Sequence, residues 1–169
     1  MLGITLRAES PADAAAIETV TVAAFRDAPH AAHTEQFIVT ALRRTRQLTL
    51  SRVAELGGEI VGHVAVSPVS LSDGSAGWFG LGPISVLPTH QVRGIGSRLM
   101  QEALRLLLER GATGCVLVGD PGYYTRFGFR SEPLLTYPGV PAEYFLALPF
   151  GDVVPEAVVT FHAAFGVQH

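Results

Sequence analysis

The sequence predicts an α/β fold in which helices cover both faces of a mixed β-sheet. Three observations carry this prediction. Two apolar runs flank the amphipathic segment after Gly96, which indicates a parallel strand–helix–strand unit from Leu81 to Gly119. Two alternating segments flank Leu56-Gly57-Gly58, which is typical of an antiparallel hairpin. The chain has 169 residues, enough for one hydrophobic core, and we expect a single domain over residues 1–169.

The first 45 residues predict one strand and two helices. Residues 4–8 alternate as a short strand does. Ser10-Pro11-Ala12-Asp13 then supplies an N-cap, a proline at the first helical position and an acid three residues after the cap. After the loop 27–33, Thr34 can cap a second helix, which we expect to end at Arg44.

Strands dominate the rest of the chain. LTLSRVAE and EIVGHVAVSPV form the hairpin, and WFGLGPISVLP is a third strand. The long helix after Gly96 has one apolar face, and Gly111 is placed to end it. The later segments are a buried strand GCVLVGD, a helical turn around Tyr123-Tyr124, and strands at FGF, EYFLALPF and AVVTFH.

Composition argues against several classes of protein. The chain is 48% hydrophobic and 16% charged with a net charge of -3, so we expect no nucleic-acid partner. No apolar run approaches membrane-spanning length, and the N-terminus lacks the apolar run of a signal peptide. We therefore expect a cytoplasmic protein with no membrane partner, and the apolar composition is compatible with a homodimer. Cys115 stands in an apolar strand and is expected in the core.

Residues Gln91 to Ser97 predict a phosphate or pyrophosphate site. The first turn of a helix has N–H groups without intrahelical partners, and its dipole is positive there. Gly94 and Gly96 let an anion approach the backbone, and Arg93 adds a fixed positive charge. Ser97 can cap the helix or donate a hydrogen bond to an oxygen. The alternative is a glycine turn that serves packing alone.

A dinucleotide site stays open as a second interpretation of these glycines. Its fingerprint needs a third small residue at the position of Leu99. It also needs a first glycine directly after the strand, but here Pro88–Gln91 separates the strand from the glycines. Asp120 does resemble a ribose-binding acid. A P-loop does not fit, because no Gly-Lys-Ser/Thr follows.

Two segments resemble motifs of the GNAT N-acetyltransferase superfamily. Val86-Leu87-Pro88 followed by Gln91-Val92-Arg93-Gly94-Ile95-Gly96 is similar to the family's acyl-CoA pyrophosphate motif. Tyr124-Thr125-Arg126-Phe127-Gly128-Phe129 is similar to its second element, a tyrosine followed by a hydrophobic-Gly-Phe end. The run 119–129 and the closing PAEYFLALPF look like one subgroup of small bacterial acetyltransferases, so the resemblance covers nearly the whole chain.

The resemblance implies a mostly antiparallel sheet whose one parallel β-α-β unit splays apart to hold acyl-CoA. The implied reaction moves acetyl from acetyl-CoA directly to a primary amine of a small molecule or protein, with CoA as product. Tyr124 would be the acid that protonates the thiolate, and the alternative for this residue is a packing role. The implied cofactor-binding residues are Ile84, Ser85 and Val86 through their backbone, Gln91, Val92, Arg93, Gly94, Ile95, Gly96 and Ser97 at the pyrophosphate, and Gly119, Asp120 and Tyr123 across the gap.

A general base is not evident in the sequence. Many family members carry a glutamate on the strand before the pyrophosphate loop, but WFGLGPISV holds no acid. His63, Asp120 and water relayed through backbone groups stay open as alternatives. His63 alternates with valines in a strand, which is more typical of a core histidine than of a base.

The resemblance places the amine acceptor at the loop Asp27–Glu35. His30 and His33 in this loop lack a third residue at ligand spacing, so we expect no metal. The absent strand glutamate keeps one alternative function open, a non-catalytic acyl-CoA sensor on the same fold.

Overall fold

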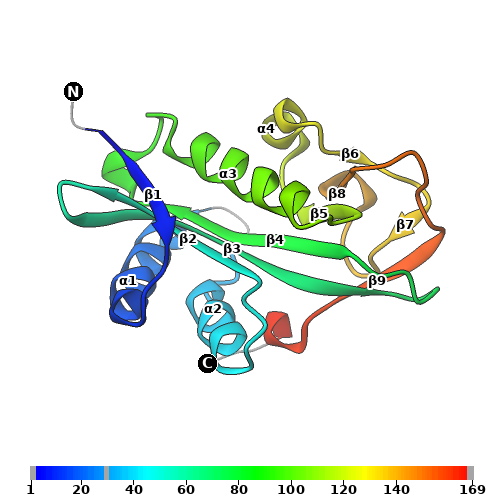
Figure 1. Cartoon of the computed structure of the whole chain (residues 1–169), viewed down its shortest axis with the longest axis horizontal. Helices are drawn as coiled ribbons and strands as arrows, with labels where there is room; N and C mark the ends of the chain where they lie inside the picture. Colours follow the sequence, from blue (N-terminus) through cyan, green and yellow to red (C-terminus); the bar gives the residue numbers. More distant parts are fainter. Residues whose placement is uncertain (1–2, 29–30, 167–169) are drawn as a thin grey trace.

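Nine strands form a mixed sheet in this computed structural model, which describes residues 3–28 and 31–166 (Figure 1). The strand order is β1-β2-β3-β4-β5-β8-β6, and β9 pairs with both β3 and β7. The strands are β1 (Thr5–Ala8), β2 (Leu50–Leu56), β3 (Glu59–Leu71), β4 (Trp78–Val86), β5 (Gly114–Val118), β6 (Arg130–Ser131), β7 (Leu135–Thr136), β8 (Phe145–Pro149) and β9 (Ala157–Phe161). The helices are α1 (Ala14–Phe25), α2 (Glu35–Arg44), α3 (Ile95–Glu109) and the short α4 (Pro121–Tyr124).

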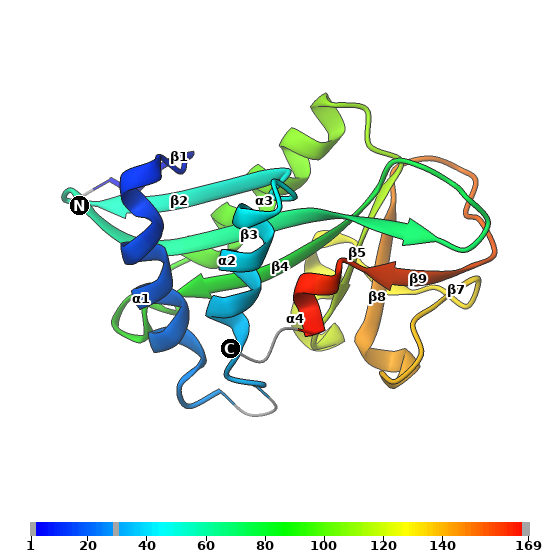
Figure 2. The same cartoon turned by 90° about the horizontal axis from the view of Figure 1, so that it is seen from below.

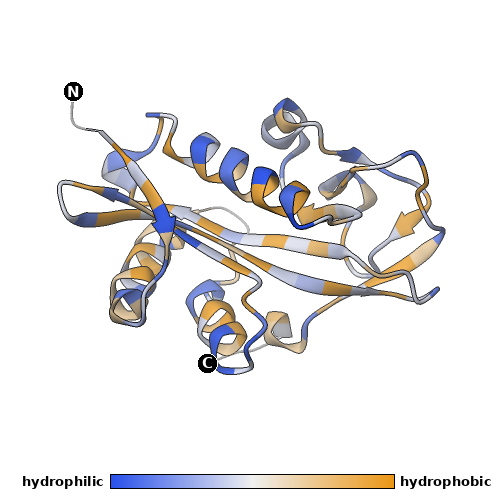
Figure 3. Cartoon of the chain, viewed as in Figure 1, coloured by the Kyte–Doolittle hydropathy of each residue, from blue (hydrophilic) through white to orange (hydrophobic). Residues whose placement is uncertain are grey.

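Helices cover both faces of this sheet, as the sequence predicts. α3 lies on one face, while α1 and α2 lie next to each other on the other (Figures 1 and 2). α3 turns its apolar side toward the strands and its hydrophilic side away from them (Figure 3). The largest buried cluster joins the inner face of α3 to β3, β4 and β5, and it includes Leu99, Ala103 and Leu107.

The start of α3 packs closely on β3, and this contact positions the site described below. Gly62 on β3 faces the helix. A Cβ at this glycine would lie 3.0 Å from Leu99 Cδ1 and 3.2 Å from Ile95 Cγ2. Since these two side chains belong to the first turns of α3, a residue without a side chain at position 62 lets the helix N-terminus rest directly on the sheet.

The parallel strands β4 and β5 separate soon after they begin. Trp78, Phe79 and Gly80 pair with residues 114–116 of β5, and no β5 partner follows for the β4 residues 81–86. On its other edge, β4 stays paired with β3 as far as Val86, with one register shift between Val64 and Val66 on β3. The sheet is therefore closed along β3 and open along β5 over the second half of β4.

Most of the predicted elements are confirmed, with two corrections. The first correction concerns the start of α3. This helix begins at Ile95, so Gly96 lies inside it. Its N-cap is Gly94, and Ser97 does not cap it. β7 was absent from the sequence prediction, because a two-residue strand shows no alternation. In the described residues, no helix has the length and apolar character needed to cross a membrane.

Candidate functional site

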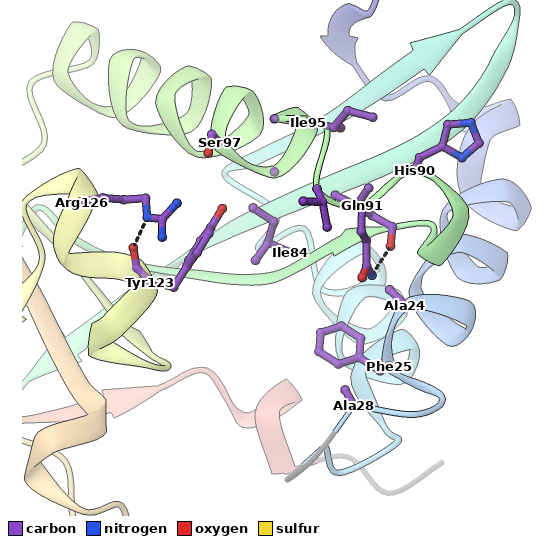
Figure 4. A pocket seen from close by; sticks show the side chains of 14 residues that line it. Ala24, Phe25, Ala28, Ile84, His90, Gln91, Ile95, Ser97, Tyr123 and Arg126 are labelled. Atoms are coloured by element: carbon purple, nitrogen blue, oxygen red, sulfur yellow. Dashed lines mark hydrogen bonds between the residues drawn. The ribbon is translucent and has the colours of Figure 1, made fainter.

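A pocket of about 560 Å³ opens where β4 has left β5 (Figure 4). Three parts of the chain form its walls: the end of β4 with the loop into α3, the C-terminal end of α1, and the segment after β5. The lining residues are Ala24, Phe25, Ala28, Ile84, Val86, His90, Gln91, Val92, Gly94, Ile95, Gly96, Ser97, Tyr123 and Arg126.

The N-terminus of α3 forms one end of the pocket. Its N-cap, Gly94, has φ +80°, a left-handed conformation that glycine adopts without strain. No side chain caps this helix, so the first-turn N–H groups of Ile95, Gly96 and Ser97 are free for an outside acceptor. Together with the helix dipole, these N–H groups favour an anion at this end.

The loop before α3 is shaped by two neighbouring residues. Gln91 donates from Nε2 to the carbonyl of Val86 at 3.0 Å, which ties the loop back to the end of β4. Val92 has φ +64° although it is β-branched, and its side chain is fully exposed. Since this side chain makes no packing contact, the strained backbone conformation at Val92 is explained by the path that the loop takes into α3.

Tyr123 forms the facing wall. A Cβ at Gly96 would lie 3.4 Å from the Tyr123 hydroxyl, so the phenol reaches across the gap to the first turn of α3. Arg126 stacks over the Tyr123 ring at 4.4 Å and donates from Nε to the Tyr123 carbonyl at 2.9 Å. Figure 4 shows these two side chains on the side of the pocket opposite Phe25 and Ala28.

Tyr124 lies behind this wall, against the core. Its ring packs on the backbone of Gly119, where a Cβ would come within 2.4 Å of Cε2, and it meets Phe129 edge to face. Burial is the main cause that raises the pKa of Tyr124 to about 12, and Tyr123 and Asp120 add to it. The Tyr124 hydroxyl therefore keeps its proton at neutral pH. Asp120 caps α4 by accepting from the Gly122 N–H at 2.8 Å.

A buried polar network lies on the other face of the sheet. The Ser51 hydroxyl lies 2.8 Å from His63 Nε2 and donates to Glu9, whose carboxylate accepts two hydrogen bonds of 2.9 Å from Arg43. His63 is fully buried, and burial lowers its pKa to about 4. His63 Nδ1 and the hydroxyl of Ser85, its neighbour across β3 and β4, are buried and have no partner among the described residues.

The structure brings together most of the residues expected to bind the cofactor. Those that line the pocket are Ile84, Val86, Gln91, Val92, Gly94, Ile95, Gly96, Ser97 and Tyr123. Those that do not line it are Ser85, Arg93, Gly119 and Asp120, together with the expected acid Tyr124. Ser85 does not line the pocket because side chains alternate along β4, and its side chain points to the face opposite that of Ile84 and Val86.

Sequence reasoning missed the contribution of α1 and two polar residues. Ala24 and Phe25 carry no chemical signature, and their period fits a core helix equally well. Arg126 belongs to the second quoted motif and His90 lies between the two parts of the first, yet neither was assigned a role. His30 lies outside the described residues, which elsewhere bring no three metal-ligand side chains together.

Comparison with known proteins agrees with this geometry. The model of the acetyltransferase (GNAT) family matches residues 14–129. "Uncharacterized N-acetyltransferase YhbS" of Escherichia coli (strain K12) is 34% identical over 126 residues, which cover 74% of this chain and 72% of that protein. The crystal structure of E. coli YhbS in complex with CoA superposes with a TM-score of 0.86 at 29% identity, covering 100% of this chain and 95% of that chain.

A second crystal structure is similar over a comparable length. It is a GNAT family acetyltransferase from Brucella melitensis in complex with acetyl-CoA, and it superposes with a TM-score of 0.86 at 47% identity. The match covers 96% of this chain and 98% of that chain. The family model spans more than half of the sequence, including the pocket loop and the aromatic segment that faces it. This chain therefore belongs to the GNAT family of acetyltransferases.

Proposed function

We propose that this protein transfers the acetyl group of acetyl-CoA to a primary amine in a ternary complex. One observation carries the proposal: the pocket lies where β4 leaves β5, and it ends on the uncapped N-terminus of α3. The two similar structures solved with acetyl-CoA and with CoA support the same ligand here.

The cofactor would lie along the open edge of β4. From Leu81 to Val86 this edge has no β5 partner, so the backbone N–H and C=O groups that point toward β5 are available to the amides of the pantetheine arm. The N–H groups of Ile95, Gly96 and Ser97 would hold the pyrophosphate, with Arg93 beside it. Gly119, Asp120 and Tyr123 would flank the cofactor from the other side of the gap.

The acceptor would enter on the α1 side. Ala24, Phe25 and Ala28 line this part of the pocket. The neutral amine nitrogen attacks the thioester carbonyl carbon, the nitrogen of the tetrahedral intermediate loses a proton to solvent, the C–S bond breaks, and CoA leaves as the thiolate. A free backbone N–H of β4 would stabilise the oxyanion of the intermediate.

Tyr124 would assist the departure of the thiolate. Its hydroxyl is protonated at neutral pH, as a donor requires. A phenol of pKa about 12 is a weaker acid than an exposed thiol of pKa about 8.5. The phenol therefore acts first as a hydrogen-bond donor to sulfur, and it yields its proton only to a thiolate whose own pKa is raised by exclusion of water.

The amine would lose its proton to solvent before it attacks. No carboxylate lines the pocket in the part of the chain that the structure describes. His63 is sealed in the network behind β4, and Asp120 is engaged as the cap of α4. Neither side chain is placed to contact an acceptor in the pocket.

Release of free thiol from acetyl-CoA, measured across a panel of primary amines, tests the proposal. The panel should include polyamines, amino acids and peptides with a free N-terminus or lysine. Amine-dependent thiol release supports catalysis. Tight acetyl-CoA binding with no release for any amine, and the same binding by Tyr124→Phe, would instead support a non-catalytic acyl-CoA sensor, which the absence of a lining carboxylate favours.

A further inference from the structure

The Arg126 guanidinium lies at the edge of the pocket, where contacts with Tyr123 fix its position. Arg126 lies in the short 3-10 turn Thr125–Phe127 and lines the pocket opposite the start of α3. Its Nε donates to the Tyr123 carbonyl at 2.9 Å, and its guanidinium carbon lies 4.4 Å from the centre of the Tyr123 ring. Its two terminal nitrogens donate to no group among the described residues, so they are free for a ligand.

Among the described residues, no acid that lines the pocket compensates the positive charge at this end. Arg126 is the one lining residue in the described chain with a permanent side-chain charge, and no carboxylate lines the pocket with it. A guanidinium that is exposed, stacked on an aromatic ring and unpaired is well suited to bind phosphate, because its fork of N–H donors matches two phosphate oxygens.

The spacing of the two cationic features indicates which phosphate Arg126 meets. The Tyr123 hydroxyl approaches Gly96 at the first turn of α3, and Arg126 covers the ring of the same tyrosine. The Tyr123 side chain thus contacts both the first turn of α3 and the Arg126 guanidinium (Figure 4). In CoA, a ribose ring separates the pyrophosphate on O5′ from the phosphomonoester on O3′.

We propose that Arg126, held by Tyr123, binds the 3′-phosphate of acetyl-CoA and so makes the protein discriminate between CoA and 3′-dephospho-CoA. This inference rests on the proposed function, since it places the pyrophosphate at α3. Tyr123 positions the guanidinium, and Arg126 supplies the contact with the ligand.

Calorimetric titration with CoA and with 3′-dephospho-CoA tests this assignment. We expect the wild-type protein to bind CoA about tenfold more tightly, which is the effect of one charge-assisted contact to phosphate. Arg126→Gln should bring the ratio of the two dissociation constants close to one, with the affinity for 3′-dephospho-CoA nearly unchanged. Arg126→Lys, which keeps the charge and loses the fork, should retain part of the preference.

Two further variants separate this effect from general electrostatics. Arg130→Gln removes an exposed arginine four residues away that does not line the pocket, and it should keep the wild-type ratio. Arg93→Glu places a like charge beside the pyrophosphate, so it should weaken both ligands by a similar factor and leave the ratio unchanged.

Several outcomes would overturn the assignment. A wild-type protein that binds both ligands equally has no 3′-phosphate subsite. An Arg126→Gln variant that keeps the full preference shows that another group holds this phosphate, and equal weakening of both ligands shows that Arg126 acts at the pyrophosphate or through the Tyr123 backbone. A wild-type protein that binds neither ligand overturns the proposed function itself, a result distinct from these three.

Discussion

Gly80 on β4 and Val116 on β5 are the last residues that pair between these two parallel strands. Beyond this pair, β4 continues for six residues; β3 remains its neighbour on one edge, and Ile84 and Val86 line the pocket. The short contact between β4 and β5 therefore both holds the two halves of the sheet together and creates the gap between them. Packing at this contact should control the stability of the whole domain.

Gly114→Ala should destabilise the protein at this contact. A Cβ at position 114 would lie 2.4 Å from Cζ3 of the buried Trp78, which has no room to move. Overpacking of this kind costs about 1–3 kcal/mol of the free energy of unfolding. Urea unfolding measures it, with Gly151→Ala as the matched control, because that glycine has open space around it. Equal stability of the two variants would contradict the rigidity assigned to this contact.

Tyr124→Phe should lower turnover by about 100-fold, the range of a positioned acid. The affinity for acetyl-CoA should stay nearly the same, because the proposed hydrogen bond is made to the departing thiolate and not to the neutral thioester of the bound cofactor. Steady-state kinetics with an accepted amine, together with calorimetry, separate the two effects. Tyr144→Phe, at a half-exposed tyrosine away from the pocket, is the control. Full turnover in Tyr124→Phe would leave this tyrosine with its packing role against Gly119 and Phe129 alone.

The pH dependence of kcat/KM should follow the acceptor amine. A lysine-like amine has a pKa of about 10, so the neutral fraction grows about tenfold per pH unit below that value. With solvent as the base, log kcat/KM should rise with unit slope through neutral pH. A plateau that begins between pH 6 and 8 would contradict this mechanism, and its loss in His90→Gln would identify His90 as the base, since this histidine lines the pocket.

The buried network behind β4 should make the protein less stable in mild acid. Burial holds the pKa of His63 near 4, below its usual 6.5, so the unfolded chain binds a proton before the folded protein does. The free energy of unfolding should fall as the pH drops from about 6.5 to 4, by up to about 3 kcal/mol. Glu9 and Arg43 face the same network. Hydrogen bonds from Arg43 and Ser51 outweigh burial and lower the pKa of Glu9, so its contribution is lost only at more acid pH.

Urea unfolding at pH 7 and pH 5 measures this effect. His63→Gln removes the titrating group, and the variant should show little change between the two pH values. An equally large loss of stability in the wild-type protein and in His63→Gln would assign the pH dependence to other groups.

The order of the helices and main strands could be predicted because periodicity and turn residues mark them. The Ser10-to-Asp13 start is an example: the Asp13 carboxylate accepts from the Ser10 N–H at 2.7 Å, as a capping box requires. The length of contact between β4 and β5 could not be predicted in this way. Residues 78–86 have the same strand-like pattern before and after Gly80, and only the resemblance implied a splay.

The site likewise has parts that the sequence predicts and parts that it does not. The glycines and the polar loop before α3 predict an anion site, because glycines in front of a helix leave its free backbone N–H groups accessible to an anion. The wall from α1 has no such signal, since Ala24 and Phe25 are the residues of any packed helix. Arg126 was hidden for another reason: an arginine within an aromatic turn acquires its role only when the fold sets it over Tyr123 and across from α3.

Calorimetric titration of the protein with acetyl-CoA, with NADH in a parallel titration, tests the central claim most directly. We predict micromolar binding of one acetyl-CoA per chain and no binding of NADH, because the gap between β4 and β5 offers a strand edge for pantetheine and a free helix N-terminus for pyrophosphate. No heat with acetyl-CoA, or NADH binding that persists in excess CoA, would contradict the assignment of this pocket.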